Sequence, residues 1–401
     1  LGSADVTINS GETLTFSRTD SHVVSAAISG DGAVDVGLSS GTGSQTVILT
    51  GDSTHAGTTT INEGTLQVGN GGTSGAVGSG PIVNEGALAL NRSDATLDMS
   101  NNISGSGPVT QTGSGTVTLS GSSAYTGNTI ANAGILKAGS STAFGNQTAW
   151  TVGGGTIDAN GQNLSTERVG GASGTIAIGS GTVTVGAAAT GHNDFSAALT
   201  GSGTLIKEGG WQQRLLGASV AFSGTIQPNN GLIIMNPTGG NLTGEPDFYF
   251  SSTDSNDGIV FGELFNAQTI ALGNLNGSGS ENARIRCDWG THGFRTLSVN
   301  QTVDGAFAGV IAQSAATRDF SLVKTGAATL TLSGANTYAQ GTTVNAGTLL
   351  VSNGSGYGTG TGTLTVQTGA TVGGIGTIGG VATIESGGIL APGASAGTLT
   401  F

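Results

Sequence analysis

The sequence is poor in cysteine, charge and aromatic residues, and each scarcity excludes a class of protein. Cys287 is the single cysteine in 401 residues, so the chain has neither an internal disulfide framework nor a multi-cysteine metal site. Lysine and arginine together number 11 and the formal net charge is −13, which argues against nucleic acid and anionic membranes as partners. No run of 18 apolar residues occurs, so no transmembrane helix is expected.

Glycine is the residue that the sequence has in excess. The chain contains 75 glycines but only 6 prolines, which excludes collagen and a proline-rich linker. Disordered chains combine low hydropathy with high net charge, whereas the mean hydropathy here is slightly positive, at +0.10. The apolar residues are mainly Val, Ile and Leu, so an ordered, strand-rich chain is predicted.

Three windows of the sequence align with one another without gaps. They are TVILTGDSTHAGTTTINEGTLQVG from Thr46, TVTLSGSSAYTGNTIANAGILKAG from Thr116 and TLTLSGANTYAQGTTVNAGTLLVS from Thr329. A degenerate fourth copy follows Leu215 and places Gly217 in the first glycine column. The columns are the first glycine column (Gly51, Gly121, Gly334), the aromatic column (His55, Tyr125, Tyr338), the asparagine column (Asn62, Asn132, Asn345) and the second glycine column (Gly64, Gly134, Gly347).

Segments such as TLTL alternate apolar and polar residues with the period of two that is typical of half-buried strands. Gly, Asn and Ser separate these segments and suit the backbone of turns. The copies begin at residues 46, 116, 212 and 329, and these spacings are multiples of roughly 23 residues, the size of a structural repeat. The pattern predicts an all-β fold, an elongated parallel β-helix (β-solenoid) of about 17 coils of roughly 23 residues.

One continuous solenoid over residues 1–401 is expected, without a linker or a second domain. Residues 236–320 depart from the pattern because they are richer in aromatic and charged residues. They are expected to form irregular coils with longer loops within the same solenoid.

The segment LVKTGAATLTLSGANTYAQGTTVNAGTLLV, residues 322–351, closely resembles the passenger-associated strand repeat of bacterial autotransporters. FAGVIAQ at 307–313 and GGILAPGASAGTLTF at 387–401 resemble the segments that flank this repeat in the same surface proteins. The resemblance implies a secreted, right-handed β-helix passenger, located outside the cell or on the bacterial surface. The chain is expected to be at most a passenger or a segment of one.

A carbohydrate-active enzyme is the main alternative, because polysaccharide lyases and hydrolases also use parallel β-helices. Such a site needs convergent carboxylates, alone or with Ca²⁺ and a basic group. The irregular region supplies the candidates: Asp254, Asp257 and Glu263, and separately Arg286, Asp288, His292 and Arg295. The catalytic residues of an enzyme would be Asp257, Glu263, Asp288 and His292. No acidic residue recurs at the repeat period, so solvated turn charges are the preferred interpretation.

Motifs for a cofactor or a metal are absent or accidental. GIGTIG at 374–379 and GASAG at 393–397 match nucleotide and nucleophile patterns by letter, but no predicted helix follows either. The histidines lie far apart, at His22, His55, His192 and His292, so neither a metal nor a cofactor is expected. His55 is predicted to pack within the aromatic column, and Cys287 to be an inert buried thiol. The asparagine column is predicted to sit at turns, where Asn tolerates left-handed backbone and bonds either to its own backbone or to a neighbouring coil.

The leading prediction for function is a non-catalytic structural or adhesive module of a bacterial surface protein or extracellular fibre. Its expected partners are copies of itself stacked end to end, or further coils of a longer parent chain, because neither end has a visible cap. A third alternative is an adhesin for surface glycans or matrix proteins, since Asn, Thr and Tyr suit sugar hydroxyls.

Overall fold

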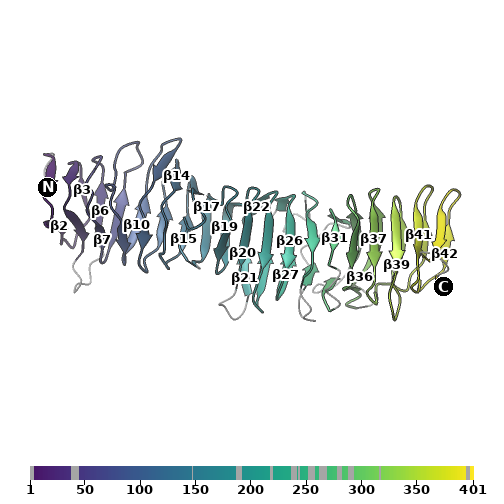
Figure 1. The fold of residues 1–401 in the computed structure, drawn as a ribbon. Coiled ribbons are helices and arrows are strands. Elements are labelled where there is room, and N and C mark those ends of the chain that lie inside the picture. The colour runs from purple at the N-terminus through teal and green to yellow at the C-terminus, as the bar shows by residue number, and fades with distance from the viewer. Residues whose placement is uncertain are drawn as a thin grey trace. The chain divides into compact units, whose positions relative to one another are not determined.

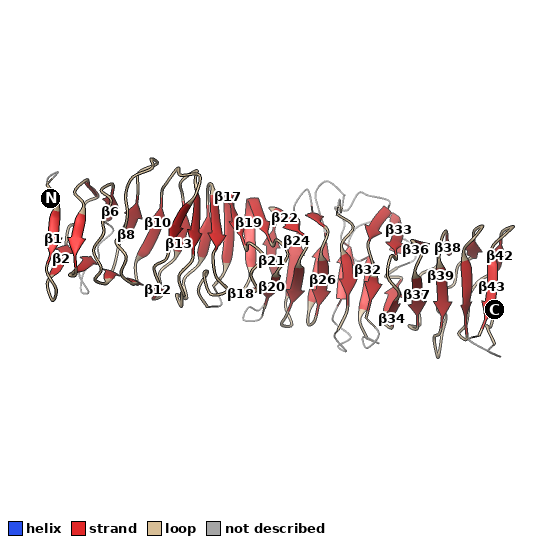
Figure 2. Cartoon of the chain, turned by 45° about the horizontal axis from the view of Figure 1, so that its top comes forward, coloured by secondary structure: helices blue, strands red, loops and turns tan. Residues whose placement is uncertain are grey.

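The computed structural model describes residues 4–37, 45–146, 148–186, 192–216, 220–235, 242, 244–251, 258–261, 269–277, 282–287, 293–315, 318–393 and 398–401. Within these ranges the chain is all-β without a helix, and its parallel strands stack as a β-solenoid of about 16 turns (Figures 1 and 2). The predicted fold class is therefore confirmed. The described residues therefore include no helix that could cross a membrane.

The chain divides into two compact units, residues 1–184 and 185–401. The strands of the first unit, with β20 at its end, are β1 (Val6–Ile8), β2 (Thr13–Phe16), β3 (His22–Val24), β4 (Ile28–Gly30), β5 (Ala33–Val36), β6 (Thr46–Leu49), β7 (Thr59–Ile61), β8 (Thr65–Val68), β9 (Ile82–Asn84), β10 (Ala87–Leu90), β11 (Leu97–Met99), β12 (Ile103–Ser104), β13 (Val109–Gln111), β14 (Thr116–Leu119), β15 (Thr129–Ala131), β16 (Ile135–Ala138), β17 (Trp150–Asp158), β18 (Leu164–Thr166), β19 (Val169–Ala177) and β20 (Thr182–Val185).

Strands of the first unit form parallel ladders along the direction of stacking. One ladder runs β2–β5–β7–β9–β12, and a second runs β3–β6–β8–β10–β13–β15–β17–β19. A third, β11–β14–β16, also ends on β17. The long strand β17 joins two faces because its register shifts at Gly153, where the strand turns a corner.

The second unit begins at Val185. Its strands are β21 (His192–Phe195), β22 (Ala198–Gly201), β23 (Thr204–Lys207), β24 (Gln212–Leu215), β25 (Val220–Phe222), β26 (Thr225–Pro228), β27 (Leu232–Met235), β28 (Asp247–Tyr249), β29 (Gly258–Phe261), β30 (Thr269–Leu272), β31 (Leu275–Asn276), β32 (Arg284–Cys287), β33 (Gly293–Asn300), β34 (Gly305–Phe307), β35 (Val310–Ala312), β36 (Arg318–Thr325), β37 (Thr329–Leu332), β38 (Thr342–Val344), β39 (Thr348–Val351), β40 (Leu364–Val366), β41 (Thr371–Gly374), β42 (Ala382–Ile384) and β43 (Ile389–Pro392). Its main ladders are β21–β24–β27–β29–β32–β35, β23–β26–β28–β31, β30–β33–β36–β38–β40–β42 and β34–β37–β39–β41–β43.

Each unit buries stacks of aliphatic side chains. In the first unit Val117, Leu136 and Ile157 occupy matching positions of β14, β16 and β17, and all three are fully buried. Leu330 and Leu349 do the same in β37 and β39 of the second unit. Each fully buried side chain of this kind contributes about 1.5–3 kcal/mol, so the alternating segments of the sequence stabilise the fold through their inward-facing residues.

The turns vary in length around the predicted average of roughly 23 residues. Leu364 of β40 pairs with Ala382 of β42, 18 residues further along the chain. Thr269 of β30 pairs with Thr296 of β33, 27 residues further along. The longer turns belong to the region 236–320, where Phe248, Phe250, Phe261 and Phe307 fill the interior in place of aliphatic residues.

Candidate functional site

The first glycine column lies where one turn rests directly on the backbone of the turn before it. A Cβ added at Gly51 would stand 2.4 Å from the carbonyl oxygen of Ala26, and one at Gly121 would stand 2.1 Å from that of Asn101. At Gly334 the distance to the carbonyl oxygen of Gly309 is 1.9 Å. No side chain fits at these distances, so glycine is required by close approach of two backbones.

The second glycine column supplies the left-handed backbone of the turn. Gly64, Gly134 and Gly347 have φ angles of 70°, 51° and 65°. The asparagine column does not share this conformation, because Asn160 and Glu245 are the non-glycine residues with positive φ in the described part of the chain. The prediction of left-handed asparagines is therefore wrong, since the glycine two positions later takes that conformation.

The expected bonds to a neighbouring turn are present, and the asparagines make them through their backbone. The amide N–H groups of Asn62, Asn132 and Asn345 donate to the carbonyl oxygens of Val36, Gln111 and Lys324, at 2.8–2.9 Å. The side chains of Asn132 and Asn345 are exposed. The side-chain amide groups of these two asparagines are thus accessible to solvent at equivalent turns of the two units.

The aromatic column is buried and hydrogen-bonded within its own turn. The hydroxyl of Tyr125 lies 2.7 Å from Oγ1 of Thr129, and that of Tyr338 lies 2.6 Å from Oγ1 of Thr342. Burial raises the pKa of both tyrosine hydroxyls, so the neutral form persists.

His55 makes the equivalent contact in the first copy. Its Nε2 lies 2.8 Å from Oγ1 of Thr59, and the side chain is fully buried. The structure thus places His55 as a packed residue, with a threonine four positions later as its partner. Thr59, Thr129 and Thr342 occupy one column of the aligned windows, but threonine is so common in these windows that the column does not stand out from the sequence.

A further glycine column covers the aromatic column from the next turn. Gly78, Gly145 and Gly360 all have positive φ, and a Cβ on each would stand 2.1–2.4 Å from the carbonyl oxygen of His55, Tyr125 or Tyr338. These glycines lie beyond the aligned windows, which explains why the alignment did not reveal them.

Substituting His55→Tyr is expected to make the first copy less sensitive to acid. Burial lowers the pKa of His55 from its ordinary value of 6.5, so the folded chain keeps the imidazole neutral. Below pH 6.5 the unfolded chain takes up a proton that the folded chain does not, and stability falls as the pH drops toward the lowered pKa. The tyrosine variant should lose this part of the pH dependence, measured by amide hydrogen exchange of β6 and β8 between pH 7 and 5.

The matched control is the reciprocal substitution, Tyr125→His. It should add acid sensitivity to β14 and β16, where the wild-type chain has a tyrosine. Equal pH dependence of β6 in wild type and His55→Tyr would contradict the assignment.

Long polar side chains at the ends of interior strands bond to the carbonyl groups of the adjoining turn. Nε2 of Gln111, the last residue of β13, donates to the carbonyl oxygens of Gly113 and Gly115 at 2.9 and 3.1 Å. Nζ of Lys324 donates to those of Thr325, Gly326 and Ala346 at 2.8, 2.9 and 3.1 Å. Lys207 takes the same role in β23, and its Nζ also lies 4.3 Å from the ring centre of Trp211. These contacts stabilise the turns because carbonyl groups leaving a strand would otherwise be buried without a partner.

The Lys324→Gln variant is expected to remove a rise in stability at alkaline pH. Burial lowers the pKa of the Lys324 ammonium from 10.5 to about 8, against a smaller opposing effect of Asp304. Between pH 8 and 10.5 the unfolded chain holds a proton that the folded chain has released, so wild-type stability rises over this range. Glutamine is neutral and already serves at position 111, so the variant should change stability at pH 7 by only about 1 kcal/mol.

The melting temperature between pH 7.5 and 10.5 measures this difference. Lys137→Gln, on the outward side of β16, is the control and should keep the wild-type slope. If the melting temperature of Lys324→Gln rose with pH as steeply as that of the wild type, the role given to the buried ammonium would be contradicted.

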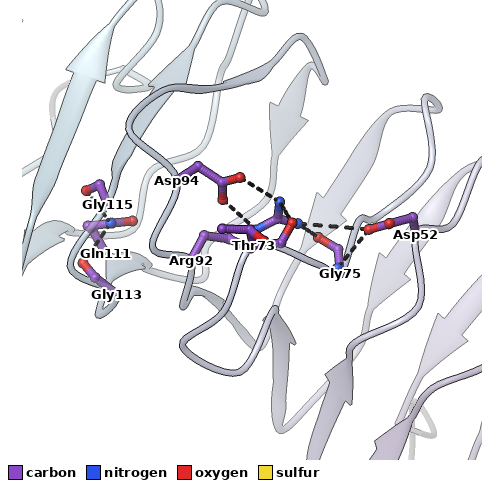
Figure 3. A network of polar contacts seen from close by, with 8 residues as sticks. All are labelled: Asp52, Thr73, Gly75, Arg92, Asp94, Gln111, Gly113 and Gly115. Atoms are coloured by element: carbon purple, nitrogen blue, oxygen red, sulfur yellow. Dashed lines mark hydrogen bonds and ion pairs between the residues drawn. The ribbon is translucent and has the colours of Figure 1, made fainter.

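Arg92 anchors the segment between β8 and β9 in the first unit (Figure 3). Its guanidinium donates to both carboxylate oxygens of Asp94, at 2.8 and 3.1 Å, and to the carbonyl oxygens of Thr73 and Gly75. Oδ1 of Asp52 lies 4.0 Å from this guanidinium and accepts from the N–H of Gly75 at 2.8 Å. The hydrogen bonds from Arg92 hold the pKa of Asp94 below its ordinary value. The buried guanidinium of Arg92 is thus matched by a carboxylate, and its role is structural.

The catalytic candidates Asp257, Glu263, Asp288 and His292 lie outside the described residues, as does Asp254. Arg286 and Arg295 are described, half-buried in β32 and β33, and Cys287 is buried beside Arg286. In the described part of the chain, no three His, Cys, Asp or Glu side chains are arranged to hold a metal ion.

The remaining motif matches and histidines occupy ordinary solenoid positions or lie outside the described residues. The GIGTIG segment continues into strand β42 and not into a helix, while Gly217 and most of GASAG are undescribed. His22 is half-buried in β3, and His192 begins β21.

Asp319 is a buried carboxylate that sequence reasoning missed. It lies in β36, where Oδ1 accepts from the N–H of Phe320 at 2.7 Å and Oδ2 from that of Ala339 at 2.8 Å. Burial raises its pKa. Because its oxygens bond to the backbone of two turns, it holds those turns together.

Comparison with known proteins identifies the repeat. The model of the passenger-associated-transport-repeat family matches residues 42–68, 109–138 and 322–351, which coincide closely with the three aligned windows. The adhesin BmaC autotransporter of Brucella suis biovar 1 (strain 1330) is 30% identical over 278 residues, covering 68% of this chain and 8% of that protein. The chain thus spans a small fraction of this relative's length. No solved structure matches it significantly.

Proposed function

Because this chain is a β-helix repeat protein of the autotransporter-passenger type, we propose that it is a non-catalytic structural and adhesive module of a bacterial surface protein. The relative that carries the similarity is named an adhesin. A passenger of this type acts outside the cell, attached to the surface or released from it. Adhesion of this chain is inferred from that similarity and from the architecture.

The observation that carries the proposal is how the repeat uses its distinctive residues. The two glycine columns and the aromatic column all serve contacts within a turn or between turns. The outward positions of the strands vary in kind: they hold threonines in β37, but Asp35 in β5 and Lys137 in β16. A scaffold that is rigid inside and variable outside suits presentation of a binding surface.

Bead adhesion tests the proposal. Polystyrene beads coated with the folded chain are expected to attach to cultured epithelial cells or to immobilised extracellular matrix several-fold more than beads coated with the heat-unfolded chain. Soluble folded chain should compete. Equal attachment of both kinds of bead would contradict an adhesive role.

An enzyme remains the competing proposal, and a separate assay distinguishes it. Acidic polysaccharides are incubated with the chain in the presence and absence of Ca²⁺. Turnover that is abolished by Asp257→Ala or Asp288→Ala would overturn the non-catalytic assignment.

The exposed edge of β42 and β43 favours an additional role in end-to-end assembly. Val381 is 75% exposed, and Ile389 and Leu390 are 50% and 40% exposed. A sheet edge that exposes apolar side chains, and to which no further strand of the described residues is paired, can accept another strand, so we propose that another copy stacks here. In a longer parent chain, a further coil would cover the same edge.

Light scattering and electron microscopy over a range of concentrations test this assembly. Leu390→Lys should abolish association, whereas Val303→Lys, at an exposed site of the same unit, should leave it unchanged. Discrete particles of the wild-type chain at every concentration would contradict end-to-end stacking.

A further inference from the structure

A groove of about 490 Å³ opens on the second unit, and the described residues that line it are all uncharged. We call it the polar groove and define it by six of its lining residues: Asn282, Ser333, Ala335, Ser352, Gly354 and Ser355. These residues come from successive turns, because Gly309 lies on Ala283, Gly334 on Gly309 and Gly356 on Ala335. With about 4.8 Å between neighbouring strands, the groove extends over roughly 15 Å along the stack.

The groove exists because the first glycine column has no side chains. Gly334 rests on the carbonyl of Gly309, so the wall is recessed there, and its neighbours are the small residues Ser333 and Ala335. The lining therefore presents hydroxyl, amide and backbone groups on a small-residue floor. Such groups donate and accept hydrogen bonds without selecting for charge.

Tyr357 adds an aromatic surface to the loop that lines the groove. Its carbonyl accepts from the N–H of Asn336 at 2.8 Å, next to the lining residue Ala335. The residue is 42% exposed, and a Cβ on Gly379 would stand 2.6 Å from its Cγ, so the ring is seated on the following turn. A partly exposed ring held in this way offers a rigid, amphipathic surface at low entropic cost.

The ligand class follows from these features. Sugars combine many hydroxyl groups with apolar C–H faces, which match a hydroxyl-lined groove whose lining loop carries a partly exposed ring two residues after Ser355. Sialylated or sulfated glycans are disfavoured, because the described lining residues include no cation and the chain carries a net charge of −13. We propose that the polar groove binds a neutral oligosaccharide, with Tyr357 stacking on one sugar ring.

The first unit contains a second groove that serves as an internal comparison. It measures about 370 Å³ and is lined by uncharged residues that include Ser123, Ser141, Thr142, Asn146, Asn163 and Ser165. Like the polar groove, it lies next to the first glycine column, since its lining begins two residues after Gly121. The aromatic residue in its lining, Phe144, is 1% exposed. We therefore expect this groove to bind sugars too weakly for detection.

Gly354 allows the polar groove to be blocked without straining the backbone. A Cβ at Gly354 meets no atom within 4 Å, and its φ is outside the left-handed region, so Gly354→Trp should place its ring in the groove. Gly72 in the first unit is equally open, and Gly72→Trp is the matched control. Tyr357→Ala removes the stacking surface.

The experiment measures binding of the whole chain to immobilised oligosaccharides. The neutral probes are N-acetyllactosamine, cellotetraose, maltotetraose and mannotetraose, and the charged probes are 3′-sialyllactose and a heparin tetrasaccharide. We expect binding to at least one neutral probe, with a Kd raised at least tenfold by Gly354→Trp and by Tyr357→Ala but unchanged by Gly72→Trp. Unchanged hydrogen exchange of β37 and β39 would show that the variants are folded.

The inference is overturned if no neutral probe binds, if only the charged probes bind, or if Gly354→Trp binds as well as wild type. It rests on the proposed adhesive role, and the bead assay separates the two. Beads that attach while no neutral probe binds would leave adhesion standing and remove the groove. Beads that fail to attach, while Gly354→Trp abolishes sugar binding, would support the sugar-binding groove and contradict the adhesive role.

Discussion

The Gly334→Ala variant is expected to lose the native contact between the turns that contain β34 and β37. The added methyl group would stand 1.9 Å from the carbonyl oxygen of Gly309, so one of the two backbones has to move. The bonds at risk flank this point: the N–H of Ser333 to Phe307, the N–H of Thr337 to Ile311, and the N–H of Ile311 to the side chain of Asn336. At about 1 kcal/mol each, their loss would cost about 3 kcal/mol locally.

Hydrogen exchange of β37 and of its neighbours β34 and β39 measures this loss. The control is Gly354→Ala, which adds the same methyl group in the second unit where no atom lies within 4 Å. It should exchange as wild type does. Slow, wild-type exchange of β37 in Gly334→Ala would show that the two backbones do not approach as closely as described.

Tyr338→Ala is expected to destabilise its turn by about 3–5 kcal/mol, the usual cost of removing a buried aromatic side chain. The ring is fully buried beneath Gly360, which cannot fill the space because it has no side chain of its own. Tyr338→Phe should cost only about 1 kcal/mol, because it removes one hydrogen bond. Thr342 keeps a partner in that variant, since its Oγ1 still donates to the carbonyl of Thr359 at 3.1 Å.

Chemical denaturation combined with hydrogen exchange of β38 separates the two variants. Tyr249→Ala removes a tyrosine of the same unit that is 45% exposed, and it should change stability by less than about 0.5 kcal/mol. If Tyr338→Ala behaved like Tyr249→Ala, the aromatic column would not support the stack.

The alignment of three windows was sufficient to predict the fold class, because it samples the same contacts three times. Alternation in segments such as TLTL identified the inward-facing residues, and the shared glycines identified the tight points. It did not distinguish the two reasons for a glycine. Gly334 is required by close approach, whereas Gly347 is required by its φ of 65°.

Contacts between a repeat window and the turn that follows it could not be predicted from the alignment. Gly78, Gly145 and Gly360 cover the aromatic column, but they follow it at unequal distances because the turns differ in length. The asparagine column was misjudged for a related reason. Asn and Gly both favour turns, and the alignment alone does not tell which of them adopts the left-handed conformation.

The candidate site was the least predictable part. The polar groove is assembled from small residues of several turns, with Asn282 and Ser355 far apart in the sequence, and none of these residue types suggests binding when taken alone. The sequence instead drew attention to the charges of residues 236–320. In that region the described residues include Asp319, whose carboxylate is occupied by backbone N–H groups of two turns.

The parallel ladders also determine how each unit would respond to a mechanical load. The hydrogen bonds between turns point along the direction of stacking, so a force that pulls the two ends of a unit apart loads successive turns in series. Turns should then peel off one at a time, with little cooperation between distant ones. Each rupture would release a length of chain set by that turn, from 18 residues at β40 to 27 at β30, so a force trace would record the turn lengths in order.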